Sequence, residues 1–222
     1  MKLRKLLLAV FAIGVTMLPM GANAQNLIVN GNFESGVAGF GTDYQVSSSG
    51  CIGCVGVAAT TQGWYNAPGY VFPFNDHTTG SGKMLQYDPP NGTHTRIWYQ
   101  SVNVVAGTTY VFEGWVREAN SEPSPNNGLV GVYANGVFLG QQRAEDNIWS
   151  NWSFNYTATF TGSIELALRD LYPTTYYGTY SAIDDLNFSA VAAPVPEPDA
   201  YAMMMAGLGL LGFMARRKRR AA

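Results

Sequence analysis

Charged side chains, histidines and cysteines are scarce in this sequence. Only 13% of its 222 residues are Asp, Glu, Lys or Arg, and it has two histidines, His77 and His94, and two cysteines. It contains neither a Gly-x-Ser-x-Gly elbow for a nucleophilic serine nor a His-Glu-x-x-His pair for a catalytic metal. These absences favour a protein that is not an enzyme.

One enzymatic alternative stays open, because glycoside hydrolysis needs only a pair of carboxylates. The candidates that could meet in the folded chain are Glu113, Glu118, Glu145 and Glu165. A hydrolase usually needs a larger scaffold with a cleft, so a glycan-modifying enzyme is the weakest of three functional hypotheses.

Basic residues are nearly absent from the middle of the chain. Between residues 25 and 190 only five Lys or Arg side chains stand against thirteen carboxylates, a formal charge of −8. Such a domain repels phosphate backbones, which excludes nucleic acid as a partner and favours divalent cations. The remaining basic residues lie in the two terminal segments.

The first 24 residues have the pattern of a signal peptide. Basic Lys2, Arg4 and Lys5 precede an apolar run, and Ala22-Asn23-Ala24 fits a small-x-small cleavage site. We therefore expect export, with cleavage before Gln25. Export also favours oxidation of Cys51 and Cys54 to a small loop disulfide, since no further cysteine or histidine cluster completes a zinc site.

The C-terminal end has a second targeting pattern. Residues 191–199 form a Pro-rich linker, and 200–222 hold an apolar stretch followed by the basic cluster Arg216 to Arg220. The stretch would span roughly 24 Å as a helix, short for a hydrocarbon core of about 30 Å. We expect a marginal, transient anchor in the inner membrane, with the basic cluster in the cytoplasm.

The motif Pro196-Glu197-Pro198, the apolar stretch and the final basic cluster together resemble the PEP-CTERM sorting signal. This resemblance covers about the last thirty residues. It implies that an exosortase processes the chain near the Pro-Glu-Pro motif and releases it to the cell surface or extracellular matrix. It indicates a destination and leaves the activity open.

Residues 25–190 are predicted to form one all-β domain. Apolar alternation and turn residues recur at intervals suited to short strands, and no helical stripe is present. Asn135-Gly136 is the clearest hairpin signal, because both residues tolerate positive φ. The expected strands are 27–29, 55–59, 70–74, 84–87, 97–105, 109–117, 129–133, 137–139, 152–160, 164–168 and 182–188. Such a series indicates a β-sandwich or jelly roll.

Three motifs resemble landmarks of the galactose-binding-like jelly rolls, which include carbohydrate-binding modules and MAM domains. They are the opening segment 26–36 with its Asn-Phe-Glu turn, the Asp-His-Thr segment 76–82, and the closing Ile-Asp-Asp strand 182–186. The resemblance implies a structural calcium site with Glu34, Asp76 and Asp184 as ligands. Alternation favours Asp184 over Asp185, because Asp184 would share a side with Leu186 and Phe188, although a bulge would reverse this.

Aromatic residues provide the candidate ligand site, since sugar rings stack on exposed aromatic faces. The densest segment runs from Tyr172 to Tyr180, and we expect Tyr172, Tyr176, Tyr177 and Trp64 to contact a ligand. Packing of the tyrosine segment on its own sandwich is the alternative. Trp98, Trp115 and Trp152 lie inside strands and are expected in the core.

The leading functional hypothesis is therefore an exported, non-catalytic surface or matrix protein. Its Ca²⁺-stabilised jelly roll would bind polysaccharide or another matrix component. The main alternative is a structural or self-associating matrix protein without a ligand site.

Overall fold

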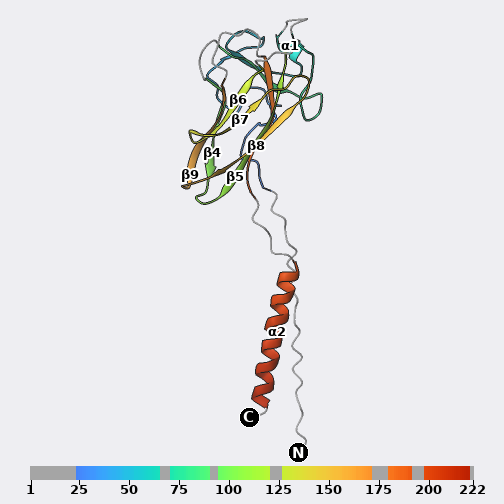
Figure 1. Ribbon diagram of the computed structural model, residues 1–222, viewed down its shortest axis with the longest axis vertical. Helices are drawn as coiled ribbons and strands as arrows, with labels where there is room; N and C mark the ends of the chain where they lie inside the picture. The colour runs from blue at the N-terminus through green and yellow to red at the C-terminus, as the bar shows by residue number, and fades with distance from the viewer. Residues whose placement is uncertain are drawn as a thin grey trace, which may run out of the picture. The chain divides into compact units, whose positions relative to one another are not determined.

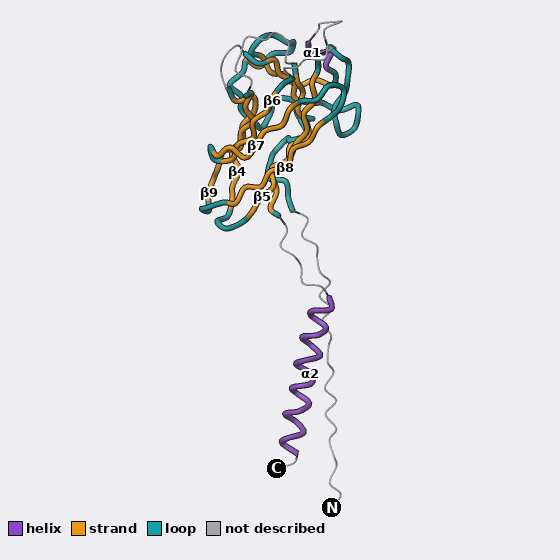
Figure 2. The backbone as a smooth tube through the Cα atoms, viewed as in Figure 1, coloured by secondary structure: helices purple, strands orange, loops and turns teal. Residues whose placement is uncertain are grey.

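The computed structural model describes residues 24–65, 71–90, 95–120, 127–171, 180–191 and 198–220. Within these segments the chain forms ten strands and two helices, shown in Figure 1 and Figure 2. Their bounds are β1 Gln45–Val46, β2 Cys54–Ala58, α1 Thr61–Tyr65, β3 Met84–Asp88, β4 Arg96–Val104, β5 Thr109–Glu118, β6 Leu129–Ala134, β7 Val137–Arg143, β8 Ser150–Thr157, β9 Gly162–Asp170, β10 Ser181–Ala190 and α2 Pro198–Arg220.

The strands all belong to one unit, Ala24–Val191, and α2 belongs to a separate one. In the strand-bearing unit, β1-β2-β3-β10-β5-β8 form one sheet and β4-β9-β6-β7 form the other. The pairs are antiparallel except for β1 with β2. The predicted all-β fold is thus a two-sheet sandwich, with short α1 as the helix in its described part.

Helix α2 is described by itself. It runs for 23 residues through the apolar stretch and the basic cluster. Among the described residues, the structure contains no helix whose length and hydropathy suffice for a membrane span.

Alternating burial explains why these segments become strands that pack face to face. In β5 every second side chain from Tyr110 to Glu118 is buried. Successive side chains of a strand point to opposite faces, so one row of apolar side chains meets the other sheet. The two inner faces bury Trp98, Phe112, Leu168 and Phe188 completely.

A second, smaller core covers the outer face of the six-stranded sheet. Trp64 and Tyr65 of α1 pack there with Met84 and Ala182, residues of β3 and β10. The chain between β2 and β3 therefore forms a layer on this face, and it carries Trp64 and the Asp-His-Thr segment 76–82.

The predicted strands from 55–59 onward correspond to the observed ones, with the exception of 70–74. In the described part of that segment, 71–74, Val71 makes only an isolated bridge with Asn120. Segment 27–29 is also not a strand, although the Leu27 amide donates to the Phe188 carbonyl at 2.8 Å. The Asn135-Gly136 turn is confirmed, with φ values of 51° and 75°.

Candidate functional site

Two of the predicted calcium ligands, Glu34 and Asp76, lie together at the loop before β3. A Cβ on Gly82 would collide with Glu34 Oε1 and lie 3.0 Å from Asp76 Oδ2. The Lys83 amide donates to Glu34 Oε1 at 2.7 Å, and the Gly82 amide donates to Asp76 Oδ1 at 2.7 Å. A pocket of about 310 Å³ opens here, and its lining includes Glu34, Gly82 and the polar side chain of Thr79.

The same hydrogen bonds set the charge of Asp76. Its burial raises the pKa, but donation from the Thr79 and Gly82 backbones outweighs this and holds the pKa below its ordinary value. Asp76 is therefore a buried carboxylate that remains ionised and holds the backbone of Thr79 and Gly82 through hydrogen bonds.

Asp184, the third predicted ligand, lies in β10 opposite Trp115. It is only 1% exposed, and its Oδ2 accepts a 2.9 Å hydrogen bond from the His77 amide. Burial raises the pKa of Asp184 to about 7, with smaller contributions from the carboxylates of Asp185 and Asp76. Asp184 thus lies within electrostatic range of Asp76.

The prediction that Asp184 shares a face with Leu186 and Phe188 is wrong. The β5–β10 register shifts between Asp184 and Asn187, and Asp185 has a φ of 51°. This bulge adds a residue, so Ile183 shares the inner face with Leu186 while Asp184 lies on the outer face. Asp184 is nevertheless buried, because the His77 loop covers it.

These positions partly fit a calcium ion. Hard oxygen atoms are what Ca²⁺ prefers, and exposed Glu34 and buried Asp76 supply them beside an open pocket. Across the described segments, however, no group of three His, Cys, Asp or Glu side chains is arranged to hold a metal ion. Backbone carbonyls would have to complete the shell, and calcium remains a prediction.

His77 belongs to an aromatic cluster that the sequence did not indicate. Its ring stacks on Trp115 with centroids 3.9 Å apart and meets Trp149 edge-on at 5.7 Å. Its Nδ1 lies 2.7 Å from Asp185 Oδ2. Trp115 is therefore on the outer face, which corrects the prediction that it belongs to the inner core, whereas Trp98 and Trp152 are buried between the sheets.

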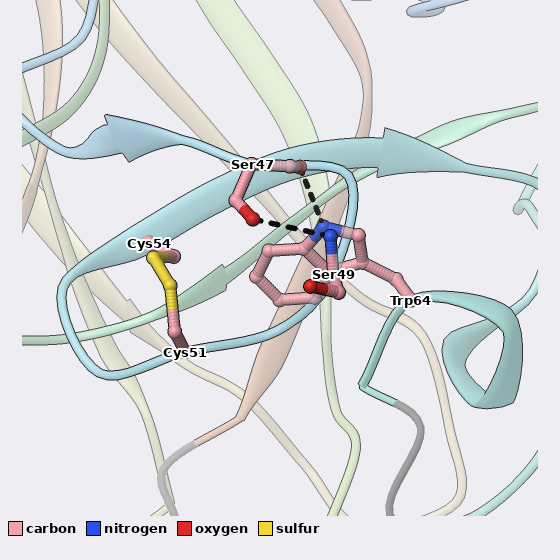
Figure 3. The surroundings of a disulfide bond; sticks show 5 residues. All are labelled: Ser47, Ser49, Cys51, Cys54 and Trp64. Carbon is pink, nitrogen blue, oxygen red and sulfur yellow. Dashed lines mark hydrogen bonds between the residues drawn. A yellow bond between two sulfur atoms is a disulfide. The ribbon is translucent and has the colours of Figure 1, made fainter.

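Trp64 is not the exposed aromatic surface that was predicted. It is 1% exposed, and its Nε1 donates to the Ser47 carbonyl at 2.9 Å (Figure 3). The segment containing Ser47 continues into the turn closed by the Cys51–Cys54 disulfide. Because loops enclose its ring, Trp64 offers no face to a sugar. The other predicted ligand contacts, Tyr172, Tyr176 and Tyr177, lie outside the described residues.

An aromatic row instead crosses the outer face of the four-stranded sheet. In register, Tyr99 of β4 lies opposite Ala167 of β9, Ala167 opposite Tyr133 of β6, and Tyr133 opposite Phe138 of β7. Because neighbouring strands lie about 4.8 Å apart, Tyr99 and Tyr133, which are two strands apart, lie about 10 Å from each other. The Tyr133 and Phe138 centroids are 5.3 Å apart, and Phe138 is 50% exposed.

Arginines accompany two members of this aromatic row. The Arg96 guanidinium lies 3.8 Å from the Tyr99 centroid, and the Arg169 guanidinium lies 5.3 Å from the Tyr133 centroid. Arg96 is fixed by Asp43 and Glu165, each with an oxygen 2.8 Å from a guanidinium nitrogen. The guanidinium groups lie over the half-buried rings of Tyr99 and Tyr133, and Phe138 is the exposed ring of the row.

Of the four carboxylates considered for glycoside hydrolysis, Glu113 and Glu165 lie on different sheets, whereas the Glu118 amide donates to the Glu145 carbonyl at 3.2 Å. Glu165 lies opposite Ser101 on the outer face of the four-stranded sheet, whereas Glu113 lies in β5 opposite Ser153 of the other sheet. Ser153 and Asn187 donate to Glu113. These two glutamates consequently flank no shared cleft.

Glu118 lies in a buried polar cluster at one end of the sandwich. It is 1% exposed and accepts hydrogen bonds from the Gly128 amide at 2.8 Å and the Ser181 hydroxyl at 3.3 Å. Burial nevertheless raises the pKa of Glu118 to about 8. Burial likewise raises the pKa of nearby Asp88 to about 7.

Comparison with known proteins confirms the C-terminal resemblance. Residues 194–220 match the PEP-CTERM protein-sorting motif, which implies export and exosortase-mediated sorting to the cell surface. No curated protein matches the chain.

Solved structures similar to this chain include sugar-binding modules. The CBM22-1 xylan-binding domain of Paenibacillus barcinonensis Xyn10C has a TM-score of 0.47 at 16% identity, with 73% of this chain and 93% of that one covered. A family 16 carbohydrate-binding module has a TM-score of 0.47 at 18% identity, covering 73% and 99%. A CBM4 structure has a TM-score of 0.42 at 16% identity, covering 74% and 99%. The fold described above rests on the strand pairing of this chain itself.

Proposed function

We propose that this chain, which carries a PEP-CTERM sorting motif, is a non-catalytic surface or matrix protein that binds polysaccharide on the outer face of its four-stranded sheet. The observation that carries the proposal is the aromatic row of Tyr99, Tyr133 and Phe138, aligned by strand register. An exported domain at the cell surface meets extended glycans, and a row of rings across a sheet suits an extended ligand.

The chemistry of a sugar matches both components of this face. The apolar faces of pyranose rings stack on aromatic rings, and their hydroxyl groups need donors and acceptors at the edges. Ser101, Asn103 and Gln141 are exposed on the same face, beside the aromatic row. The row lies on strands rather than loops, so binding costs little conformational entropy of the protein.

Calcium bound at Glu34, Asp76 and Asp184 belongs to the same proposal, as does a galactose-binding-like jelly-roll topology. The crowding of Glu34 and Asp76 oxygens at Gly82 supports the calcium site. The ion would add positive charge among these carboxylates and tie the opening turn to the loop before β3.

Glycan binding is tested with two phenylalanines of similar exposure. Phe138→Ala should weaken binding of the purified protein to a soluble polysaccharide about two- to twelvefold, because one lost stacking contact is worth about 0.5–1.5 kcal/mol. Phe160→Ala, which removes a ring that is 41% exposed in the β8–β9 connection, should not. Equal affinities for both variants across a panel of glycans would refute the assigned face.

Self-association is the second candidate function. Val137 and Phe138 are exposed on β7, an edge strand that carries neither lysine nor proline to discourage pairing with another chain. Concentration-dependent assembly in sedimentation, without any response to glycans, would favour this function over polysaccharide binding.

Sorting is tested separately in cells. Deletion of Arg216 to Arg220 or substitution Glu197→Ala should leave the protein unprocessed and reduce its delivery to the surface, because both lie within the matched motif. Normal processing of both variants would refute the proposed sorting route.

A further inference from the structure

We infer that the Cys51–Cys54 disulfide is a redox-active centre that exchanges with dithiols, and that Asp88 is its proton donor. This activity is separate from polysaccharide binding and does not depend on it. It follows from the exposure of the two cysteines, from the hydrogen bonds of their loop and from the residue opposite the buried one.

The two cysteines lie in different environments. Cys51 is exposed in the turn before β2, whereas Cys54 is the first residue of β2 and is completely buried (Figure 3). A thiolate in solution can therefore reach Cys51 and not Cys54. Because exchange begins when a thiolate attacks one sulfur of a disulfide, this difference makes Cys51 the attacked sulfur and Cys54 the leaving group.

Backbone hydrogen bonds hold the loop that carries both cysteines. The Cys54 amide donates to the Cys51 carbonyl at 2.9 Å, and the Gly53 amide donates to the Asp88 carbonyl at 2.9 Å. The Gln45 amide in turn donates to the Gly53 carbonyl at 2.9 Å. Since these bonds do not require the bond between the sulfur atoms, reduction should leave both thiols close together. The disulfide can then open and close while the domain stays folded.

Asp88 lies directly opposite Cys54 in the antiparallel pair of β2 and β3. Side chains at opposite positions share one face of a sheet, with Cβ atoms about 4.5–5.5 Å apart. The adjacent Val55 and Tyr87 belong to the core between the sheets, so Cys54 and Asp88 point to the outer side. Asp88 is 6% exposed. A buried carboxyl group is thus the cross-strand neighbour of the buried sulfur.

The leaving sulfur of Cys54 needs a proton. Its surroundings include Trp64, Tyr65 and Met84, and a thiolate among such side chains is costly. Burial raises the pKa of Asp88 to about 7, so its carboxyl group keeps a proton in mildly acidic solution. Within the described segments, no cation forms an ion pair with Asp88 that would keep it ionised.

Other titratable groups close to Asp88 do not supply this proton. The phenols of Tyr44, Tyr65 and Tyr180 lie within electrostatic range of it, and burial raises the pKa of each above its ordinary value. They therefore stay neutral while Asp88 titrates. The carboxyl group of Glu118 on β5 also acts on Tyr65, which places it in the same polar cluster.

The exchange balances in electrons and protons. One thiolate of a dithiol attacks Cys51 Sγ, forms a mixed disulfide and breaks the Cys51–Cys54 bond. The electron pair leaves on Cys54 Sγ, which takes the proton of Asp88, and solvent returns a proton to the carboxylate. The second thiolate attacks the other sulfur of the same dithiol and releases Cys51 as a thiolate, which solvent protonates. The dithiol loses two electrons and becomes a disulfide, and the protein gains them.

Reduction of the folded protein by dithiothreitol tests the inference, with the released thiols measured by alkylation. Wild type and Asp88→Asn are compared at the same pH, so the ionisation of dithiothreitol cancels from the ratio of their rates. We expect wild type to react about tenfold faster at about pH 6, a modest value for general acid catalysis. This advantage should vanish or reverse at about pH 8.5, where Asp88 has lost its proton.

Glu118→Gln is the matched control. It removes another buried carboxyl group whose pKa burial raises, but Glu118 lies opposite Ser181 and not opposite Cys54. This variant should be reduced as fast as wild type at both pH values. If it slows as much as Asp88→Asn does, or if Asp88→Asn matches wild type at both pH values, Asp88 is not the proton donor.

Single cysteine variants test the centre without altering Asp88. Cys54→Ser leaves the exposed Cys51 as a free thiol, which should form a mixed disulfide with oxidised glutathione at least about tenfold faster than the buried Cys54 of Cys51→Ser does. If both variants react equally fast, or if dithiothreitol reduces wild type only after urea has unfolded it, the disulfide is an inert cross-link and the inference is overturned.

Discussion

The buried carboxyl group of Glu118 should make the stability of the domain strongly dependent on pH. The unfolded chain titrates this group near 4.5, whereas burial raises the folded pKa to about 8. Between these values the folded state keeps a proton that the unfolded state has lost. The resulting stability is fully present below the unfolded pKa and declines as the pH rises toward the folded one.

The size of the effect follows from the two pKa values. Each pKa unit corresponds to about 1.36 kcal/mol, so the free energy of unfolding should fall by about 3 kcal/mol between pH 5 and pH 8 through Glu118. For a chain of this size that is a decrease of about 6–12 °C in the midpoint of thermal unfolding. Asp88 adds a decline of the same sign, because its folded pKa is also raised, to about 7.

Glu118→Gln removes the titration and keeps the shape of the side chain. The NH2 group of an amide cannot accept a hydrogen bond, whereas the two carboxyl oxygens of Glu118 accept from the Asn120 and Gly128 backbones, so the variant should be about 1 kcal/mol less stable than wild type at pH 5. The decline of its stability with pH should nevertheless be shallower than that of wild type, because Asp88 and Asp184, whose pKa values burial also raises, then contribute without Glu118. Thermal unfolding at five pH values between 5 and 9 measures both quantities.

Ile164→Val provides the comparison for this experiment. It shortens a buried side chain that is 2% exposed, costs about 0.5–1.5 kcal/mol and changes no titrating group. It should lower the whole curve and leave the slope unchanged. If Glu118→Gln declines with pH as steeply as wild type and Ile164→Val, the folded state does not hold a proton at Glu118, and the argument from burial is wrong.

Three further predictions follow from the turns and the opening segment. Calcium at 100 times its Kd should stabilise the folded domain by about 2.7 kcal/mol and so raise the midpoint of thermal unfolding. Glu34→Ala or Asp184→Ala should abolish this rise, and identical midpoints with calcium and with chelator would exclude the site. Gly31→Ala should destabilise the domain by about 1–3 kcal/mol in urea, because its Cβ would collide with the Leu186 carbonyl; wild-type stability would show that this turn can move. Replacing both cysteines by serine should cost about 2 kcal/mol, as expected for so short a closed loop, and an unchanged urea midpoint would show that the disulfide does not stabilise the fold.

Alternation of apolar residues was sufficient to locate most of the strands. The pattern in 109–117 predicted β5, and Asn135-Gly136 predicted the turn between β6 and β7. These signals are local, since they depend on side chains two residues apart or on the φ values of two adjacent residues. The sequence did not predict the short helix α1, because five residues are too few to show the 3.6-residue repeat of apolar side chains.

Alternation failed where the chain departs from a regular strand. Asp184 lies on the opposite face from the one predicted, because the bulge before Asn187 inserts a residue that no local pattern announces. Trp64 and Trp115 were assigned to the wrong environments for a related reason. Their burial depends on whether loops 47–54 and 76–82 fold over the outer face of the six-stranded sheet.

The sequence by itself determined the β class, the main strands, the hairpin turn and the sorting motif, because each depends on residues close together in the chain. Only the tertiary structure decided which strands are neighbours and in what register they pair. Tyr99, Tyr133 and Phe138 form one row, with the Arg169 guanidinium over the Tyr133 ring, only because β4, β9, β6 and β7 lie in this order. Strand order reflects the packing of two complete sheets against each other, an energy shared by the whole core and carried by no single segment.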